Sequence, residues 1–192
     1  MTTYDIMVAR RSIRKFKQDP IAQEVLERAV NVARLAPCGG NMQSLKFCIV
    51  QSPELVKGIF AHSKWGMHLP DGSGRPKEGE EPTAWVLILN DKRIREQAFV
   101  MDIGAAAENI IIYALSEGIA SCWLENLQRP EIAALLELPE HLQLHSAIAL
   151  GYPGMEAKEV ALPASGDTKY FWGEQGGFCV PKRSLDEVML IK

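Results

Sequence analysis

The chain has only four cysteines among its 192 residues (Cys38, Cys48, Cys122 and Cys179), and no two of them form a C-x-x-C pair. They do not stand near histidines at the spacing of a zinc site either. The sequence therefore offers no basis for a disulfide framework or a thioredoxin-like redox motif. We expect reduced, unpaired thiols, which is the usual state of cysteine in the cytoplasm.

Long apolar runs and a strong charge of one sign are also missing. The longest apolar stretches, such as Trp85 to Leu89 and Ile110 to Leu115, are far too short to span a bilayer. Residues 1–17 are charged and lack the apolar core of a signal peptide. The net charge of −3 provides no basic field for nucleic acid or an anionic membrane. We expect a soluble cytoplasmic protein that binds neither.

Several common motifs of catalysis and phosphate binding are absent. The sequence has no G-x-G-x-x-G after a strand, no G-x-x-x-x-G-K-[ST] and no G-x-S-x-G elbow. Its four histidines form no H-E-x-x-H helix, and His141 and His145 stand four apart where the pattern indicates the approach to a strand. We therefore expect no metal site.

The apolar pattern predicts helices and strands in one domain of α+β class. Helical spacing or helix-start signals indicate five helices, the second beginning at Asp19-Pro20 with Asp19 as its N-cap, and apolar or β-branched runs indicate four strands. We expect the helices to surround one mostly antiparallel or mixed sheet. The segment 62–82 should be a long exposed excursion. The predicted helices cover about 1–10, 19–33, 53–60, 95–117 and a short stretch from 130, and the strands 46–51, 84–90, 119–124 and 144–150.

The first candidate binding segment in the sequence is a dense basic cluster. Arg10, Arg11, Arg14 and Lys15 surround Ser12, and together they form a natural grip for a phosphate group. A second basic pair stands far along the chain at 182–183 and could fold back to the same phosphate. For either segment alone, the alternative of a solvated surface patch is the more common one.

Two further segments have the composition of a ligand site. Residues 36–43, with the sequence APCGGNMQ, follow a predicted helix, and their paired glycines let main chain approach a flat ligand. The amides of Asn41 and Gln43 suit the uracil-like edge of a flavin, although a plain helix-terminating loop is the alternative. Residues 124–126 leave a predicted strand, where ligands often bind, and a main-chain N–H there could meet a flavin N5.

Taken together and in order, these segments resemble the nitroreductase family of FMN enzymes. One block would be weak support, but six blocks follow the order and approximate spacing of the family and span nearly the whole chain. They are RRSIRKF at 10–16, LAPCGGNMQ at 35–43, DIGAAAEN at 102–109, GIASCW at 118–123, ALGYP at 149–153 and VPKRSL at 180–185.

The resemblance implies a single domain over residues 1–192 with the three-layer sandwich of the family and an intertwined homodimer. One FMN per subunit would lie at the dimer interface. The small-residue run 104–107 fits a closely packed interface helix, with an ordinary core helix as the alternative. Residues 62–82 would be a variable loop, and residues 154–192 a C-terminal extension that completes the FMN site.

The resemblance also assigns candidate FMN ligands, residue by residue. The first group would serve the phosphate, ribityl and pyrimidine end, with Arg14 near N1 and O2, and the second would reach the flavin from the partner subunit. The third would lie over the flavin near N5, and the fourth would bind the phosphate. In chain order the groups are Arg10, Arg11, Ser12 and Arg14; Pro37, Cys38, Gly39, Asn41 and Gln43; Leu124, Glu125 and Asn126; and Lys182 and Arg183.

The implied activity is electron transfer from NADH or NADPH to a small acceptor, such as a nitroaromatic or a quinone, by a ping-pong mechanism. The chemistry would take place at FMN N5, so no side chain is assigned as catalytic and Glu125 is only a weak candidate. A specialised flavin enzyme (a dehalogenase or flavin-fragmenting type) and a non-catalytic flavin-binding protein are the alternatives. Cys38 departs from the serine common in the family, which weakens a side-chain contact there, and Ser44-Leu45 replaces a common Pro-Trp pair, which alters packing behind the flavin. The loop 62–82 and the aromatic residues Tyr170-Phe171-Trp172 vary widely among such proteins and are expected to shape the acceptor pocket, so the choice of acceptor does not transfer.

Overall fold

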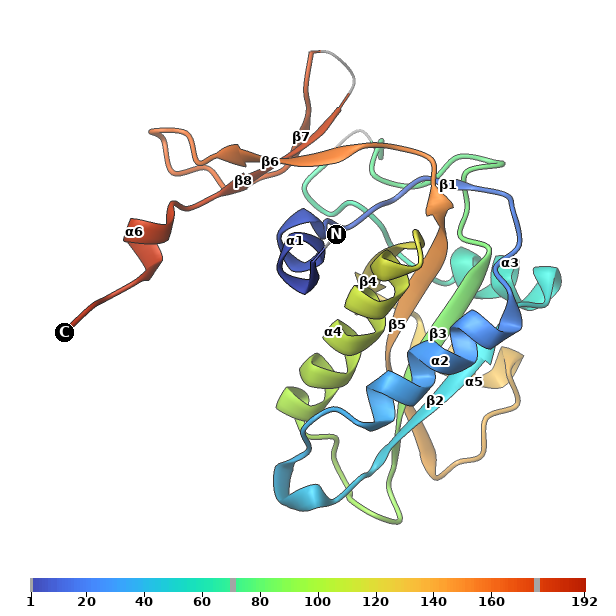
Figure 1. Ribbon diagram of the computed structural model, residues 1–192. Coiled ribbons are helices and arrows are strands. Elements are labelled where there is room, and N and C mark those ends of the chain that lie inside the picture. The colour runs from blue at the N-terminus through green and yellow to red at the C-terminus, as the bar shows by residue number, and fades with distance from the viewer. Residues whose placement is uncertain (1, 70–71, 175–176) are drawn as a thin grey trace.

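A five-stranded sheet forms the centre of the molecule in this computed structural model, which describes residues 2–69, 72–174 and 177–192 (Figure 1). Strand β5 pairs with β1, β3 and β4, and β2 pairs with β3, and all of these pairings are antiparallel. The prediction of an α+β fold with a mostly antiparallel sheet is therefore confirmed. The strands are β1 (Phe16–Lys17), β2 (Leu45–Val50), β3 (Ala84–Asp91), β4 (Ala120–Leu124) and β5 (Leu142–Pro153).

Strand β3 is buried on both faces, as its unbroken apolar run predicts. Its residues alternate between two cores because successive side chains of a strand point to opposite sides. Trp85 and Leu87 pack with α3 (Pro53–Ala61) and α5 (Arg129–Leu135), whereas Val86 and Ile88 pack with α2 (Gln23–Arg34) and α4 (Val100–Ser116). Two helical layers thus enclose the sheet, which confirms the three-layer sandwich.

Helix α2 begins later than predicted, at Gln23, and Ala22 is its N-cap. The expected cap at Asp19 is wrong because tertiary contacts hold residues 18–21 outside the helix. The side chain of Gln18 donates to the Glu81 carbonyl at 2.9 Å, and that of Gln51 donates to the carbonyl of buried Ile21, also at 2.9 Å. Helix α4 likewise begins at Val100, five residues after its predicted start.

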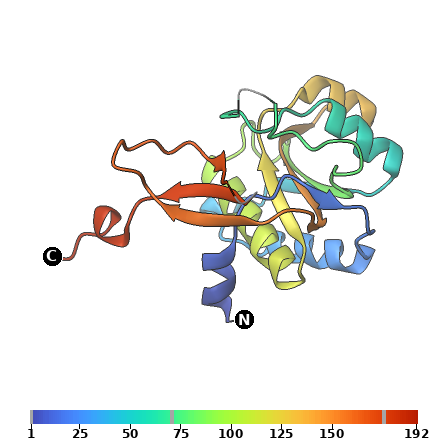
Figure 2. The same ribbon diagram turned by 90° about the horizontal axis from the view of Figure 1, so that it is seen from above.

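Beyond β5 the chain forms an arm that projects from the sandwich (Figures 1 and 2). A second sheet builds the arm, with β8 between a parallel neighbour, β6, and an antiparallel neighbour, β7. The sequence predicts none of these strands, because they are short and their polar residues break any alternation. The elements of the arm are β6 (Ala157–Ala161), β7 (Phe171–Trp172), β8 (Phe178–Lys182) and α6 (Leu185–Val188).

The described part of the excursion at 62–82 contains no helix and no strand, but the expectation that it is exposed is wrong in part. Arg75 donates to the carbonyls of Ser63 at 2.7 Å and Phe60 at 3.0 Å. Gly66 and Gly74 are buried against each other, and a Cβ on Gly66 would lie 2.5 Å from Gly74 Cα. The excursion therefore packs onto the sandwich through Arg75 and Phe60, and the glycine contact closes the excursion on itself.

The remaining short elements are helix α1 (Thr3–Ala9), which Thr2 and Asp5 cap, and the 3-10 turn η1 (Gly39–Asn41). Within the described ranges, no helix combines the length and apolar character that crossing a bilayer requires.

Candidate functional site

A cavity of about 690 Å³ lies beside the C-terminal end of β4. Four candidates from two distant segments line it together: Arg14, Leu124, Glu125 and Asn126. Its volume lies in the range of pockets that hold small molecules and cofactors. These four candidates line this cavity, and the other candidates lie elsewhere.

Neighbouring segments fix the loop at 124–126 from two sides. Arg129 donates from Nη2 to the Glu125 carbonyl and from Nε to the His145 carbonyl, each at 2.8 Å. On the other side, the main-chain N–H of Lys64 donates to the Asn126 carbonyl at 3.0 Å, and Ser63 forms a β-bridge with Leu127. The loop and the first residues of the excursion therefore form one connected wall.

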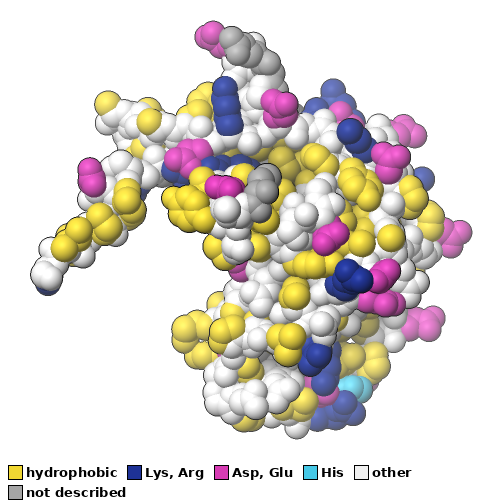
Figure 3. Space-filling model, in the orientation of Figure 1, with side chains coloured by type: hydrophobic (Ala, Val, Ile, Leu, Met, Phe, Trp, Pro, Cys, Tyr) yellow, Lys and Arg dark blue, Asp and Glu magenta, His cyan; other side chains and the backbone are white. Residues whose placement is uncertain are grey.

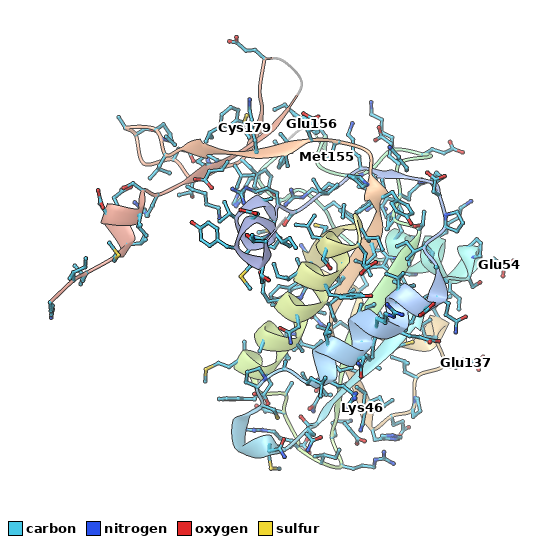
Figure 4. All side chains as sticks on the ribbon, viewed as in Figure 1. Lys46, Glu54, Glu137, Met155, Glu156 and Cys179 are labelled. Carbon is cyan, nitrogen blue, oxygen red and sulfur yellow. The ribbon has the colours of Figure 1, made fainter. Side chains whose placement is uncertain are left out.

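Arg14 lines this cavity without an acidic partner. Among the described residues no carboxylate lies within salt-bridge distance of its guanidinium, whose Cζ is 4.6 Å from the ring centroid of Tyr170 and 5.2 Å from that of Phe178. Its main-chain N–H donates to the sulfur of Met155 at 3.4 Å, and Figure 4 shows Met155 near the base of the arm. The guanidinium of Arg14 is thus contacted by aromatic rings and keeps its positive charge.

The other basic side chains of the N-terminal cluster are paired with carboxylates. Arg10 lies 3.6 Å from Glu108, and Arg11 donates to Glu159 of β6 at 2.6 Å. Arg10 and Arg11 border a separate small cavity of about 130 Å³, and Ser12 forms a β-bridge with Ser121.

The candidates at 37–43 lie elsewhere. Pro37, Cys38 and Gln43 line a cavity of about 350 Å³ together with Ala33 and Ala106 of the α2–α4 layer. The first cavity contacts the core on the opposite face of the sheet through Cys122 and Leu124. Within one chain, the two groups of candidates therefore do not meet.

A buried carboxylate holds the 37–43 loop in place. Asp102, which is 5% exposed, accepts hydrogen bonds from the Gly39 N–H at 2.8 Å and from the Cys38 thiol at 3.2 Å. The Cys38 sulfur in turn accepts from the Gln43 N–H at 3.2 Å. Asn41, two residues after Gly39, has a positive φ of 53°. The sequence interpretation did not single out Asp102, although a carboxylate on the core face of a predicted helix was an available signal.

The two basic candidates near the C-terminus lie on the arm. Lys182 ends β8, and Arg183 follows it and lies 3.5 Å from Glu187 of α6. Both side chains are exposed. Neither lines the cavity that contains Arg14.

The cavity also has walls outside the candidate FMN ligands, from the two segments that the sequence indicated for the acceptor pocket, residues 62–82 and 170–172. Lys64 adds a second cation, while Trp65 and Tyr170 add flat rings. Trp65 packs against the edge of Trp85, with ring centroids 6.0 Å apart. Burial raises the pKa of the Cys122 thiol in the wall, so this cysteine stays protonated at neutral pH. Among the described residues, no group of three or more His, Cys, Asp or Glu side chains is arranged to hold a metal ion.

Relatives of the chain carry related names. A protein of Archaeoglobus fulgidus, provisionally named NADH dehydrogenase/NAD(P)H nitroreductase, is 32% identical over 155 residues, which cover 77% of this chain and 83% of the relative. The iodotyrosine deiodinase of Drosophila melanogaster is 27% identical over 177 residues, 78% of this chain and 62% of that protein.

The fold is shared with solved structures. A nitroreductase of Desulfovibrio desulfuricans, crystallised with FMN, superposes with a TM-score of 0.70 over 100% of this chain and 97% of its own, at 21% identity. The sequence model of the Nitroreductase family matches residues 7–152, well over half of the chain. The chain therefore belongs to the nitroreductase family.

Proposed function

We propose that the chain is an FMN-dependent oxidoreductase that transfers electrons from NADH or NADPH to a small acceptor, such as a quinone or a nitroaromatic, by a ping-pong mechanism. The observation that carries the proposal is the joint lining of one cavity by Arg14 and residues 124–126. The FMN in the Desulfovibrio structure and the NAD(P)H in the name of the Archaeoglobus relative support it.

The groups around the cavity fit FMN. Arg14 and Lys64 supply positive charge, Asn126 can donate and accept, and Trp65 and Tyr170 offer flat walls. When bound, FMN supplies the hydride-accepting atom N5 and the redox chemistry. Arg14 would stabilise negative charge at the N1 and O2 edge, where its planar guanidinium can bind two acceptors. Main chain at 124–126 would contact the flavin near N5.

The remaining candidates would complete the site. Arg10, Arg11 and Ser12 precede Arg14 on the same segment and would serve the phosphate and ribityl end, where the phosphate would compete with Glu159 for Arg11. The loop containing Pro37, Cys38, Gly39, Asn41 and Gln43 lies across the sheet from the cavity, so we assign it to the site of the partner subunit. Lys182 and Arg183 would bind the phosphate from the arm of the C-terminal extension, residues 154–192.

A homodimer would cover apolar surface that one chain leaves in water. On the arm, Leu190 and Ile191 are 87% and 85% exposed, and Leu185 and Val188 of α6 are also exposed (Figure 3). Exposed apolar surface of this kind marks interaction sites. Deleting residues 184–192 should therefore weaken dimerisation, which light scattering after gel filtration measures. A full-length protein that is monomeric at all concentrations would contradict the dimer.

The decisive experiment uses the purified full-length protein incubated with FMN. A flavin absorption band at about 450 nm that survives gel filtration establishes binding. Oxidation of NADH or NADPH that depends on menadione or a nitrofuran then establishes the activity. Protein that stays colourless and refuses FMN would overturn the proposal. Bound FMN without turnover would identify a flavin-binding protein instead, and release of iodide from iodotyrosine would favour the deiodinase alternative.

Replacing Cys38 by serine should preserve both FMN binding and turnover. A serine hydroxyl can donate to Asp102 as the thiol does, so the change in binding free energy should stay below about 1 kcal/mol. Steady-state kinetics and FMN titration check this expectation. Loss of turnover with FMN still bound would show that the thiol itself takes part in the chemistry.

A further inference from the structure

Arg14 differs from its basic neighbours in the type of side chain that contacts its charged group. Arg10, Arg11 and Lys15 each lie within 4 Å of a glutamate carboxylate. The described residues place no such group beside Arg14, whose guanidinium faces two aromatic rings instead. Since a carboxylate would cancel the charge that the cavity presents, this difference bears directly on the proposed flavin site.

The two rings belong to an aromatic shelf on the arm, formed by Tyr170, Trp172 and Phe178. Phe178 is fully buried and stands at its centre, with ring centroids 5.2 Å from Tyr170 and 4.9 Å from Trp172. Tyr170 covers the guanidinium more closely than Phe178 does and also lines the cavity. The shelf thus brings the C-terminal arm to Arg14 in the cavity wall.

The excursion holds Tyr170 from its other side. The His68 N–H donates to the Tyr170 hydroxyl at 3.4 Å, and the two rings meet edge to face at 5.3 Å. Trp172 donates from Nε1 to the Ser73 hydroxyl at 3.2 Å. Tyr170 is therefore wedged between the excursion and Arg14, which limits the rotation of its ring.

A ring face attracts a cation without neutralising it, because the attraction comes from the quadrupole of the π system and not from a net charge. The guanidinium can therefore be fixed in place and still present its full charge and its N–H groups to a bound anion. A carboxylate at the same position would fix the side chain and remove that charge.

We propose that Tyr170 is a positioning residue for Arg14 that fixes the guanidinium at the flavin pocket and leaves its charge uncompensated. The inference rests on the proposed FMN function. Bound FMN gains negative charge on reduction, so a well-placed cation stabilises the reduced form more than the oxidised form. Loss of the Tyr170 ring should weaken FMN binding and shift its midpoint potential to a more negative value.

The test compares Tyr170→Phe, which keeps the ring, with Tyr170→Leu, which removes the π face. We expect the FMN dissociation constant to rise about 3- to 30-fold for Tyr170→Leu, in line with the strength of a cation–π contact, and the potential to fall. Tyr170→Phe should restore both to near wild type. Phe171→Leu, an exposed neighbour in β7, is the matched control and should change neither value.

A fluorination series keeps the result decisive even if Tyr170→Leu fails to fold. Phenylalanine analogues with increasing fluorine content at position 170 keep the ring shape and progressively weaken its quadrupole. Under the proposal, FMN affinity and midpoint potential fall stepwise with fluorine content. If wild type binds FMN and the series leaves both values unchanged, the role of Tyr170 is wrong while the proposed function stands. If wild type takes up no FMN, the proposed function itself fails.

Discussion

Replacing Arg14 by alanine is expected to raise the FMN dissociation constant about 10- to 100-fold, which corresponds to the loss of a charge-assisted hydrogen bond of about 1.5–3 kcal/mol. Arg14 lines the cavity beside Lys64, and among the described residues it is the arginine of this lining and has no carboxylate partner, so no neighbouring arginine can replace its planar charge at the same place. Equilibrium dialysis followed by the flavin absorbance measures the change.

Two further variants sharpen this result. Arg14→Lys keeps the charge and loses the planar fork, so its affinity should lie between those of wild type and Arg14→Ala. Arg28→Ala removes an exposed arginine that pairs with Glu24 on α2 and does not line the cavity, so it should leave FMN affinity unchanged. An Arg14→Ala protein that remains fully yellow after dialysis and is reduced as before would refute the role of Arg14.

Replacing Trp85 by alanine is expected to destabilise the apo-protein by about 3–5 kcal/mol, a large part of the 5–15 kcal/mol typical of a whole domain. Trp85 is fully buried in β3, and its Nε1 donates to the Val56 carbonyl of α3 at 3.2 Å. The substitution leaves a cavity, removes that hydrogen bond and takes away the support of Trp65 in the cavity wall. Urea unfolding followed by circular dichroism measures the loss.

Trp85→Phe is the matched control because it keeps an aromatic ring and most of the volume. Its destabilisation should be clearly smaller, although the hydrogen bond from the indole to the Val56 carbonyl is still lost. A loss below about 1 kcal/mol for Trp85→Ala would show that the core collapses around the gap, contrary to the close packing of this layer.

The strands and helices of the sandwich can be predicted from the sequence wherever burial of apolar side chains alone decides the structure. The unbroken apolar run of β3 predicts a strand covered on both faces, and helical spacing predicts α2 and α4. The start of α2 was mispredicted because the contact between Gln51 and the Ile21 carbonyl is made by residues 30 apart. The arm was missed for the same reason, since β6 and β8 depend on each other for their hydrogen bonds.

The candidate site, too, could be predicted from the sequence only in part. The motif residues Arg14 and Leu124–Asn126 were proposed from the sequence, and the fold places them around one cavity. Tyr170 was expected only as part of the acceptor pocket, and Asp102 was assigned no role. Their roles follow from what they contact: a guanidinium 156 positions away for Tyr170, and the Gly39 N–H and Cys38 thiol for Asp102. A tyrosine or an aspartate in the sequence does not by itself indicate which groups it will contact in the fold.

The first residues of the excursion join it to the loop after β4. Lys64 donates to the Asn126 carbonyl, and Ser63 forms a β-bridge with Leu127. Farther along the excursion, His68 and Ser73 contact Tyr170 and Trp172 of the arm, and Arg75 contacts the end of α3. An exchange of the excursion in protein engineering should therefore retain these three residues. Met67 lines the cavity, is 79% exposed and makes none of these contacts, so substitutions there should alter which molecules the protein accepts while the loop assigned to N5 keeps its place.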